Sequence, residues 1–241
     1  MQQIIQCVPN ISEGRNREIV QAVVDAVGQA PGVKLLDWSS DADHNRSVIT
    51  FVGNAQGVEE AAFALCAKAT ELIDMTGHTG EHPRMGATDV IPFIPIQGIS
   101  MEECIELANR VGKRIGQELA IPVYMYEKAA KFPARENLAN IRRGQYEGLP
   151  KKLLKEEGLP DYGPHTFNAK SGATAVGARM PLVAFNVNLG TDSLEIANQI
   201  ARNVRHAGGG LKAVKAMGVK LEERGIVQVS MNIVNYKETP L

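Results

Sequence analysis

Cysteine is scarce in this chain of 241 residues, and neither sign of charge is in excess. Cys7, Cys66 and Cys104 lie far apart without a C-x-x-C spacing, which argues against a disulfide framework and a cysteine zinc site. Each stands in an apolar run, so we expect buried thiols. The formal net charge is only −1, which argues against a nucleic-acid partner.

Long apolar runs are missing as well. No stretch reaches the roughly 20 residues that a membrane helix needs, and the N-terminus has no basic segment followed by a long apolar one. We therefore expect a cytoplasmic protein without membrane association. Hydrophobic residues make up 44% of the chain and charged residues 22%, which is typical of a globular protein with a sizeable core.

A segment rich in ionisable and conformationally unusual residues, 77–89 (GHTGEHPRMGATD), is the strongest functional signal. Imidazole beside carboxylate holds a base that works near neutral pH, and glycines with a proline give a backbone that can approach a ligand closely. We predict that the functional site lies here. Glu81 and Asp89 are alternative partners for orienting a histidine ring, and either could equally stabilise the loop.

A metal site is an alternative reading of the same segment. His78 to His82 match H-x-x-E-H, a zinc-peptidase pattern that requires a helix so that both histidines share one face. Gly77, Gly80 and Pro83 oppose a helix, and proline alone costs about 3 kcal/mol in a helix interior. We therefore expect no metal. A metal hydrolase would be excluded by a metal analysis without stoichiometric zinc.

The first half of the chain predicts the order β-α-β-β-α-β, which is the split βαβ arrangement of a ferredoxin-like domain. The predicted strands cover 2–8, 33–38, 47–53 and 90–96, and the predicted helices cover 16–27 and 56–75. Pro92 and Pro95 remove two backbone donors, so we expect the strand 90–96 to lie at an edge or partly unpaired.

The middle of the chain predicts less regular structure. A helix capped by Ser100 and Glu103 is followed by a short strand at 123–126 and by a basic helical stretch at 135–155. Within that stretch, Arg142-Arg143 and Lys151-Lys152 indicate a solvated basic face. Residues 156–172 predict a long loop, and long loops in compact domains are often functional.

A second βαββ pattern follows in 177–241, with strands at 181–189, near 219 and at 226–234, and a helix at 193–206. By analogy with the first half, one helix and one strand are missing at its C-terminal end. We therefore predict an α+β fold of two ferredoxin-like subdomains, 1–176 and 177–241, with the second incomplete.

Several segments together resemble the formiminotransferase family, and the resemblance runs over essentially the whole chain. The segments are CVPNISEG at 7–14, Asn45-Arg46, GEHPRMG at 80–86 followed by Asp89, Tyr146-Glu147, LPKK at 149–152, and Gly172-Ala173-Thr174. The chain departs from the family near Ser39 and Ser40, where the family has an acidic residue, although Asp37 or Asp41 could substitute.

The resemblance implies a set of site residues. His82 occupies the position of the catalytic histidine. The folate-binding stretch corresponds to Gly163, Pro164, His165, Thr166, Phe167, Asn168, Ala169, Lys170, Ser171 and Gly172. Arg46 and Arg84 are candidates for binding substrate carboxylates through a bidentate fork, with an ion pair as the equal alternative for each. The resemblance also gives Arg142-Arg143 and Lys151-Lys152 a second interpretation, as a track for an anionic polyglutamate tail.

The implied reaction is transfer of a formimidoyl group from N-formimidoyl-L-glutamate to tetrahydrofolate, as in histidine degradation, by a homodimer that needs no metal. A folate nitrogen would attack the formimidoyl carbon, and one imidazole could take the first proton and supply it to the leaving amine. Two alternatives stay open. One is formyl transfer between glutamate and folate in the same site, and the other is a non-catalytic folate-binding fragment.

Overall fold

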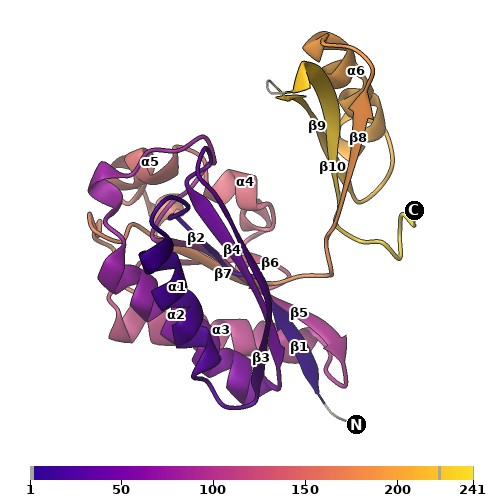
Figure 1. Cartoon of the computed structure of the whole chain (residues 1–241). Helices are drawn as coiled ribbons and strands as arrows, with labels where there is room; N and C mark the ends of the chain where they lie inside the picture. Colours follow the sequence, from indigo (N-terminus) through magenta and orange to yellow (C-terminus); the bar gives the residue numbers. More distant parts are fainter. Residues whose placement is uncertain (1–2, 222–223, 241) are drawn as a thin grey trace. The chain divides into compact units, whose positions relative to one another are not determined.

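The computed structural model describes residues 3–221 and 224–240. The chain divides into two compact units, Met1–Arg179 and Met180–Leu241, and each is described by itself. The division falls just after strand β7 (Thr174–Ala178), whereas the boundary expected from the sequence, 176/177, falls inside that strand. Figure 1 shows the two units and the labels used below.

The first unit is a mixed sheet covered by helices on both faces. Its other strands are β1 (Ile4–Cys7), β2 (Asn10–Ile11), β3 (Val33–Asp41), β4 (Arg46–Gly53), β5 (Thr88–Gln97) and β6 (Val123–Glu127). Its α-helices are α1 (Arg17–Gly28), α2 (Ala55–Leu72), α3 (Met101–Glu118), α4 (Leu138–Ile141) and α5 (Gln145–Lys152), and short 3-10 turns include η1 (Met75–Gly77).

The predicted split βαβ arrangement is confirmed. Strand β4 pairs antiparallel with both β1 and β3, and β5 pairs antiparallel with the other side of β1. The short β2 continues the position of β1 between β4 and β5. Two strands that follow later in the chain extend the sheet in parallel, with β7 beside β5 and β6 beside β7.

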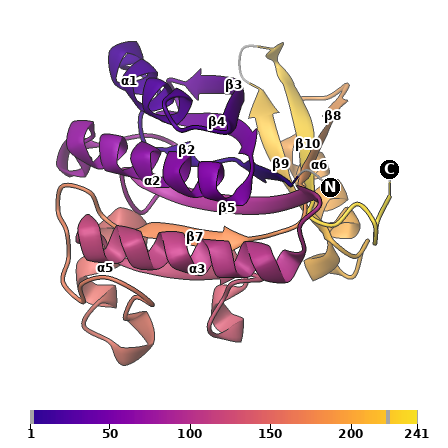
Figure 2. The ribbon, with the colours of Figure 1, turned by 90° about the horizontal axis from the view of Figure 1, so that it is seen from below.

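Alternation along the strands divides the interior into two layers. In β6, Val123 and Met125 face one core, while Tyr124 and Tyr126 face the other. The larger core lies under α1, α2 and α3, which lie side by side over one face of the sheet (Figure 2). The smaller core lies under the short helices α4 and α5. Because α4 and α5 cover the second face, the segments that flank them are brought to the site described below.

The strand 90–96 was expected at an edge or partly unpaired. The edge position was wrong, because β5 is a central strand between β1/β2 and β7, whereas the partial unpairing is observed. The two prolines fit because their missing donors face gaps in the ladders. The carbonyl of Pro92 accepts from the Val8 amide at 3.4 Å, so its ring nitrogen faces the break between β1 and β2. Pro95 faces the opposite neighbour, beyond the last β5–β7 pair, Phe93 with Ala178.

Helix ends follow the local sequence signals. Asn16 caps α1 by accepting from the amides of Glu18 and Ile19, and Ser100 with Glu103 forms the predicted capping box of α3. In the described ranges, no helix is long and apolar enough to cross a membrane.

The second unit contains β8 (Val183–Leu189), α6 (Leu194–Val204), β9 (Val214–Leu221) and β10 (Ile226–Ile233). Strand β10 lies between β8 and β9 and is antiparallel to both, which is again a split βαβ arrangement. Helix α6 packs Ala197 and Ala201 onto Val227 and Val229. The α+β class with two sheets is thus confirmed, and the βαββ order predicted for this part is observed.

Candidate active site

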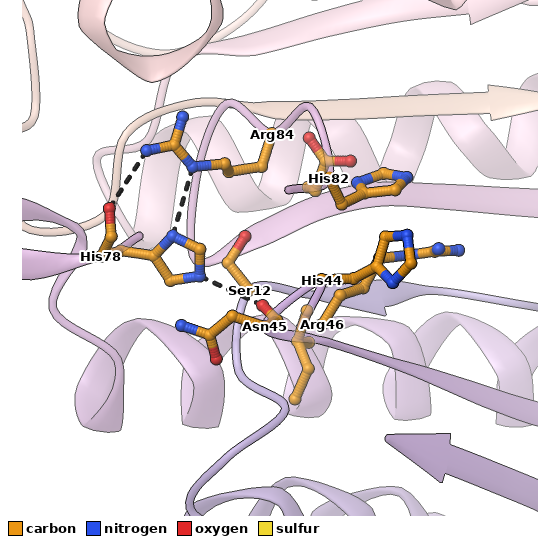
Figure 3. Close-up of a pocket in the computed structure, with 9 residues that line it drawn as sticks. Ser12, His44, Asn45, Arg46, His78, His82 and Arg84 are labelled. Carbon is orange, nitrogen blue, oxygen red and sulfur yellow. Dashed lines mark hydrogen bonds between the residues drawn. The ribbon is translucent and has the colours of Figure 1, made fainter. Parts of the chain in front are cut away.

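Two connecting segments of the first unit meet at the candidate site: the β3–β4 turn and the stretch between η1 and β5 (Figure 3). Side chains from these segments and from the end of β2 line a small hollow: Ile11, Ser12, His44, Asn45, Arg46, His78, His82, Arg84 and Asp89. The predicted segment 77–89 therefore contributes four of the nine lining residues.

Asn45 joins the two segments. Its φ of 47° lies in the left-handed region, which asparagine tolerates better than most residues. Its amide oxygen accepts from the Gly14 amide at 3.0 Å, and its amide nitrogen donates to the Thr79 carbonyl at 2.9 Å. The side chain is buried, so these bonds fix the turn against the histidine-bearing segment.

His78 has a defined tautomer. Its Nε2 lies 3.1 Å from the carbonyl oxygen of Asn45, and a carbonyl can only accept, so Nε2 carries the proton. Nδ1 then accepts from Nε of Arg84 at 3.2 Å. Burial lowers the pKa of His78 below its usual value, as expected for a ring held neutral. With both ring nitrogens in use, His78 is a structural residue.

The guanidinium of Arg84 is held by hydrogen bonds to other residues of the chain. Its guanidinium forms a bidentate pair with Glu147 at 2.5 and 2.9 Å, and it also donates to the His78 carbonyl at 3.1 Å. Its carbonyl accepts from the Tyr146 amide at 2.9 Å. Of the two roles expected for Arg84, the structure therefore contains the ion pair, which ties the histidine-bearing segment to the start of α5.

His82 lies on the opposite side of the hollow from His78, next to His44 (Figure 3). The rings of His44 and His82 are 6.3 Å apart between centroids and meet edge to face. Burial, followed by the positive charges of Arg46 and Arg142, lowers the pKa of His82 to about 3. The ring is therefore neutral at physiological pH, and one of its nitrogens can accept a proton.

The buried carboxylate expected as a partner of His82 has other partners. Asp89 accepts from the Met85 amide at 2.9 Å through one oxygen and forms a short ion pair with Arg142 through the other. Glu81 is exposed, and its amide donates to the Asp43 carbonyl. Asp89 thus holds the backbone after His82 and fixes the guanidinium of Arg142 near the ring.

Arg46 is the second fixed cation. Its Nε donates to the side-chain oxygen of Asn10 at 2.8 Å, and Asn10 in turn donates to the Val8 carbonyl at 3.1 Å. Burial and then the charge of Arg142 lower the pKa of Arg46. The two guanidinium groups therefore interact unfavourably with each other beside His82.

Residues 163–172, the expected folate segment, lie against the histidine-bearing segment. The Ala87 amide donates to the Ser171 carbonyl at 2.9 Å, the Ala173 amide donates to the Met85 carbonyl at 3.0 Å, and Gly86 and Gly172 form a β-bridge. Within the segment, the ring of Phe167 lies 5.3 Å from that of Tyr146, while His165 and Thr166 are exposed. The two segments are therefore held together by backbone hydrogen bonds between buried residues.

Comparison with known proteins decides the family. The profile of the formiminotransferase domain, N-terminal subdomain, matches residues 4–179, and that of the formiminotransferase domain matches residues 184–241. The chain belongs to the formiminotransferase family. Its resemblance to that family, inferred above from short segments, is confirmed, and the chain is accordingly a transferase.

Three relatives illustrate the range of this formiminotransferase family. The chain is 55% identical over 241 residues to glutamate formimidoyltransferase of Streptococcus pyogenes serotype M1, covering 100% of the chain and 81% of the relative. It is 48% identical over 240 residues to the protein of the same name in Thermoplasma acidophilum, covering 99% and 79%. It is 48% identical over 247 residues to formimidoyltransferase-cyclodeaminase of Gallus gallus, covering 100% and 46%.

Two residues of this formiminotransferase site were missed in the sequence. The first is His44, which is exposed and lies 3.0 Å from Asp41, as in a solvated turn, yet its ring also lines the hollow. Arg142 was expected on a solvated basic face together with Lys152. Instead it reaches the buried Asp89, and Lys152 donates to the Ile141 carbonyl. The ion pair of Arg142 with Asp89 joins residues far apart in the sequence, so no local sequence pattern indicates it.

The zinc-peptidase alternative lacks its structural requirement, because residues 78–82 are not helical and the two histidines lie on different sides of the hollow (Figure 3). Across residues 3–221 and 224–240, no group of three or more His, Cys, Asp or Glu side chains could hold a metal ion. The three cysteines are free and buried, as expected.

Proposed function

We propose that this formiminotransferase moves the formimidoyl group of N-formimidoyl-L-glutamate to tetrahydrofolate, with His82 as the proton shuttle. The observation that carries the proposal is the junction of the His82 segment with residues 163–172. At this junction, a formimidoyl donor bound beside His82 would lie next to a tetrahydrofolate bound by residues 163–172. The two relatives named glutamate formimidoyltransferase support the choice of the formimidoyl group over the formyl group.

The chemistry needs one group that moves a proton twice. A secondary amine nitrogen of tetrahydrofolate attacks the formimidoyl carbon, and His82 takes the proton that this nitrogen must lose. The tetrahedral intermediate then breaks its bond to the glutamate nitrogen, and His82 returns the proton to that leaving amine. Proton transfer by a positioned imidazole contributes about 10²–10⁴-fold to the rate.

Tetrahydrofolate is the proposed co-substrate of residues 163–172. Phe167 offers a flat apolar face, supported by Tyr146, and the hydroxyl of Tyr146 donates to the Ala169 carbonyl at 2.5 Å. Asn168 and Gly172 close the segment on itself through a backbone bond of 2.7 Å. Because these bonds already order the segment, binding of the folate ring would cost little additional conformational entropy.

The test is the transfer assay with His82→Asn, following glutamate release. We expect kcat to fall by about 10²-fold or more, while the dissociation constant of 5-formyltetrahydrofolate stays within about threefold, because only proton transfer is lost. His206→Asn, an exposed histidine of the second unit, is the matched control and should keep wild-type rates. Near-normal turnover in His82→Asn would refute the shuttle role.

A further inference from the structure

One feature of the site is not required by the proton shuttle alone: two arginines act on His82, and among the described residues only one of them, Arg142, forms an ion pair. Asp89 neutralises Arg142 through their ion pair. Arg46 is held through Nε by the neutral side chain of Asn10. Among the described residues, Arg142 thus has an ion-pair partner, whereas Arg46 has no carboxylate at ion-pair distance and feels Asp89 and Asp41 only through longer-range electrostatics.

Arg142 has an unused donor. In the described part of the chain, its Nε is buried and has no hydrogen-bond partner. A buried donor without a partner is costly, most of all in a charged group, unless a ligand later supplies the acceptor. The neighbouring Arg46 adds a second guanidinium whose orientation is already fixed. Paired guanidinium groups with free donors are the usual way in which proteins bind carboxylates.

We propose that Arg46 and Arg142 form a carboxylate subsite that binds the glutamyl group of the formimidoyl donor, and that its occupation allows His82 to accept the reaction's proton. The proposal rests on the proposed function, since it names how that same site holds its donor. It places Arg142 at the donor end of the site, whereas its run of basic residues indicated a solvated face or a track for the folate tail.

Electrostatics links the subsite to His82. The positive charges of Arg46 and Arg142 are, after burial, the main reasons why His82 resists protonation in the empty site. A bound carboxylate offsets them and so favours the imidazolium. The titratable and charged groups that line the hollow or act on this ring, from all the elements packed around it, are His44, Arg46, His78, Arg84, Asp89 and Arg142. Only the substrate adds a new negative charge.

Two measurements without turnover test the subsite. The first is calorimetric binding of L-glutamate, the amino-acid product. The second is the ¹⁵N NMR titration of His82 in histidine-labelled protein, with and without saturating L-glutamate. His82→Asn identifies its signals among the five histidines. We expect the midpoint of His82 to rise by at least about one pH unit when L-glutamate is bound.

Arginine variants give the specific prediction. Arg46→Gln and Arg142→Gln should each weaken L-glutamate binding by at least about tenfold and reduce its effect on His82. Arg142→Lys keeps a charge opposite Asp89, so it should fold normally yet still bind L-glutamate several-fold more weakly. Arg143→Gln, an exposed neighbour bonded only to Asn140 among the described contacts, should match wild type.

The carboxylate bound by the two arginines could come from the formimidoyl donor or from the glutamate tail of folate. Binding of 4-aminobenzoyl-L-glutamate, which reproduces the folate tail, distinguishes the two. If Arg142→Gln weakens only this compound, the subsite belongs to folate and the assignment to the donor is wrong. Normal L-glutamate binding in both Gln variants, or a His82 midpoint that L-glutamate does not move, would overturn the subsite. Because neither readout needs turnover, failure of the transfer reaction is a separate result.

Discussion

At the scale of single residues, His78 and His82 show how the same side chain, four positions apart, can stand in two different environments. Both nitrogens of His78 are used in bonds to Asn45 and Arg84. His82 instead meets His44 edge to face and lies in the field of two arginines. The segment pattern predicted that histidines matter here, but only the partners from distant parts of the chain distinguish the hydrogen-bonded ring of His78 from His82, the proposed shuttle.

A pH dependence of stability follows from these two rings. The pKa of His82 is lowered to about 3 and that of His78 is also lowered, whereas an unfolded histidine titrates near 6.5. Below about pH 6.5 the unfolded chain therefore binds more protons than the folded chain. The free energy of unfolding should fall as pH is lowered from 7.5 to 5, by less than about 1.4 kcal/mol per unit for the partly exposed His82.

Urea unfolding at pH 7.5, 6.5 and 5.5 measures this dependence, in a range where carboxylates stay ionised. His82→Gln should flatten the curve, because it removes a ring that the fold keeps neutral. His206→Gln should leave the slope unchanged. Equal slopes for wild type and His82→Gln would mean that His82 protonates freely in the folded protein.

At the scale of elements, local periodicity predicted most strands and helices of both units, because those signals repeat within one segment. It missed β2 and β7, and it predicted one helical stretch where α4 and α5 are separate helices. The prediction failed where an element's position depends on contacts with segments distant in the sequence. Pro92 and Pro95 argued for an edge strand, yet each ring nitrogen faces a gap that only the pairing of β5 with β1, β2 and β7 reveals. Likewise Arg142 follows α4 in a basic stretch, but α4 covers the second face of the sheet and places it on Asp89.

The junction between the His82 segment and residues 163–172 depends on Gly86. A Cβ atom at this position would lie 2.4 Å from the Ser171 carbonyl oxygen and 2.5 Å from that of Ala173. Both are backbone atoms of a bridged segment and cannot move alone. Gly86→Ala should therefore destabilise the protein by about 1–3 kcal/mol and separate the two halves of the site.

Gly77→Ala is the matched control in the same stretch, because a Cβ atom there would meet nothing within 4 Å. Thermal unfolding and transfer rates are measured for both variants. Gly86→Ala should lower the melting temperature and the rate together, and Gly77→Ala should change neither appreciably. Wild-type stability in Gly86→Ala would show that the His82 segment and residues 163–172 can separate without loss of stability.

At the scale of the whole molecule, the two units have separate interiors. The clusters under α1–α3 and under α4–α5 draw only on the first unit, and the cluster of Ala197, Ala201, Val227 and Val229 draws only on the second. The two family profiles divide the chain at the same place, with matches ending at residue 179 and beginning at 184. The residues of the proposed site all lie in the first unit.

Separate cores predict separate unfolding transitions. Leu65→Ala, in the fully buried centre of α2, should cost about 2–5 kcal/mol and move only the transition of the first unit. Val229→Ala, in β10, should cost about 1.5–3 kcal/mol and move only that of the second. Calorimetry of both variants, read beside hydrogen exchange to assign each transition, measures this. If either substitution moves both transitions by the same amount, the chain unfolds as one cooperative unit, and the second unit stabilises the site-bearing unit directly.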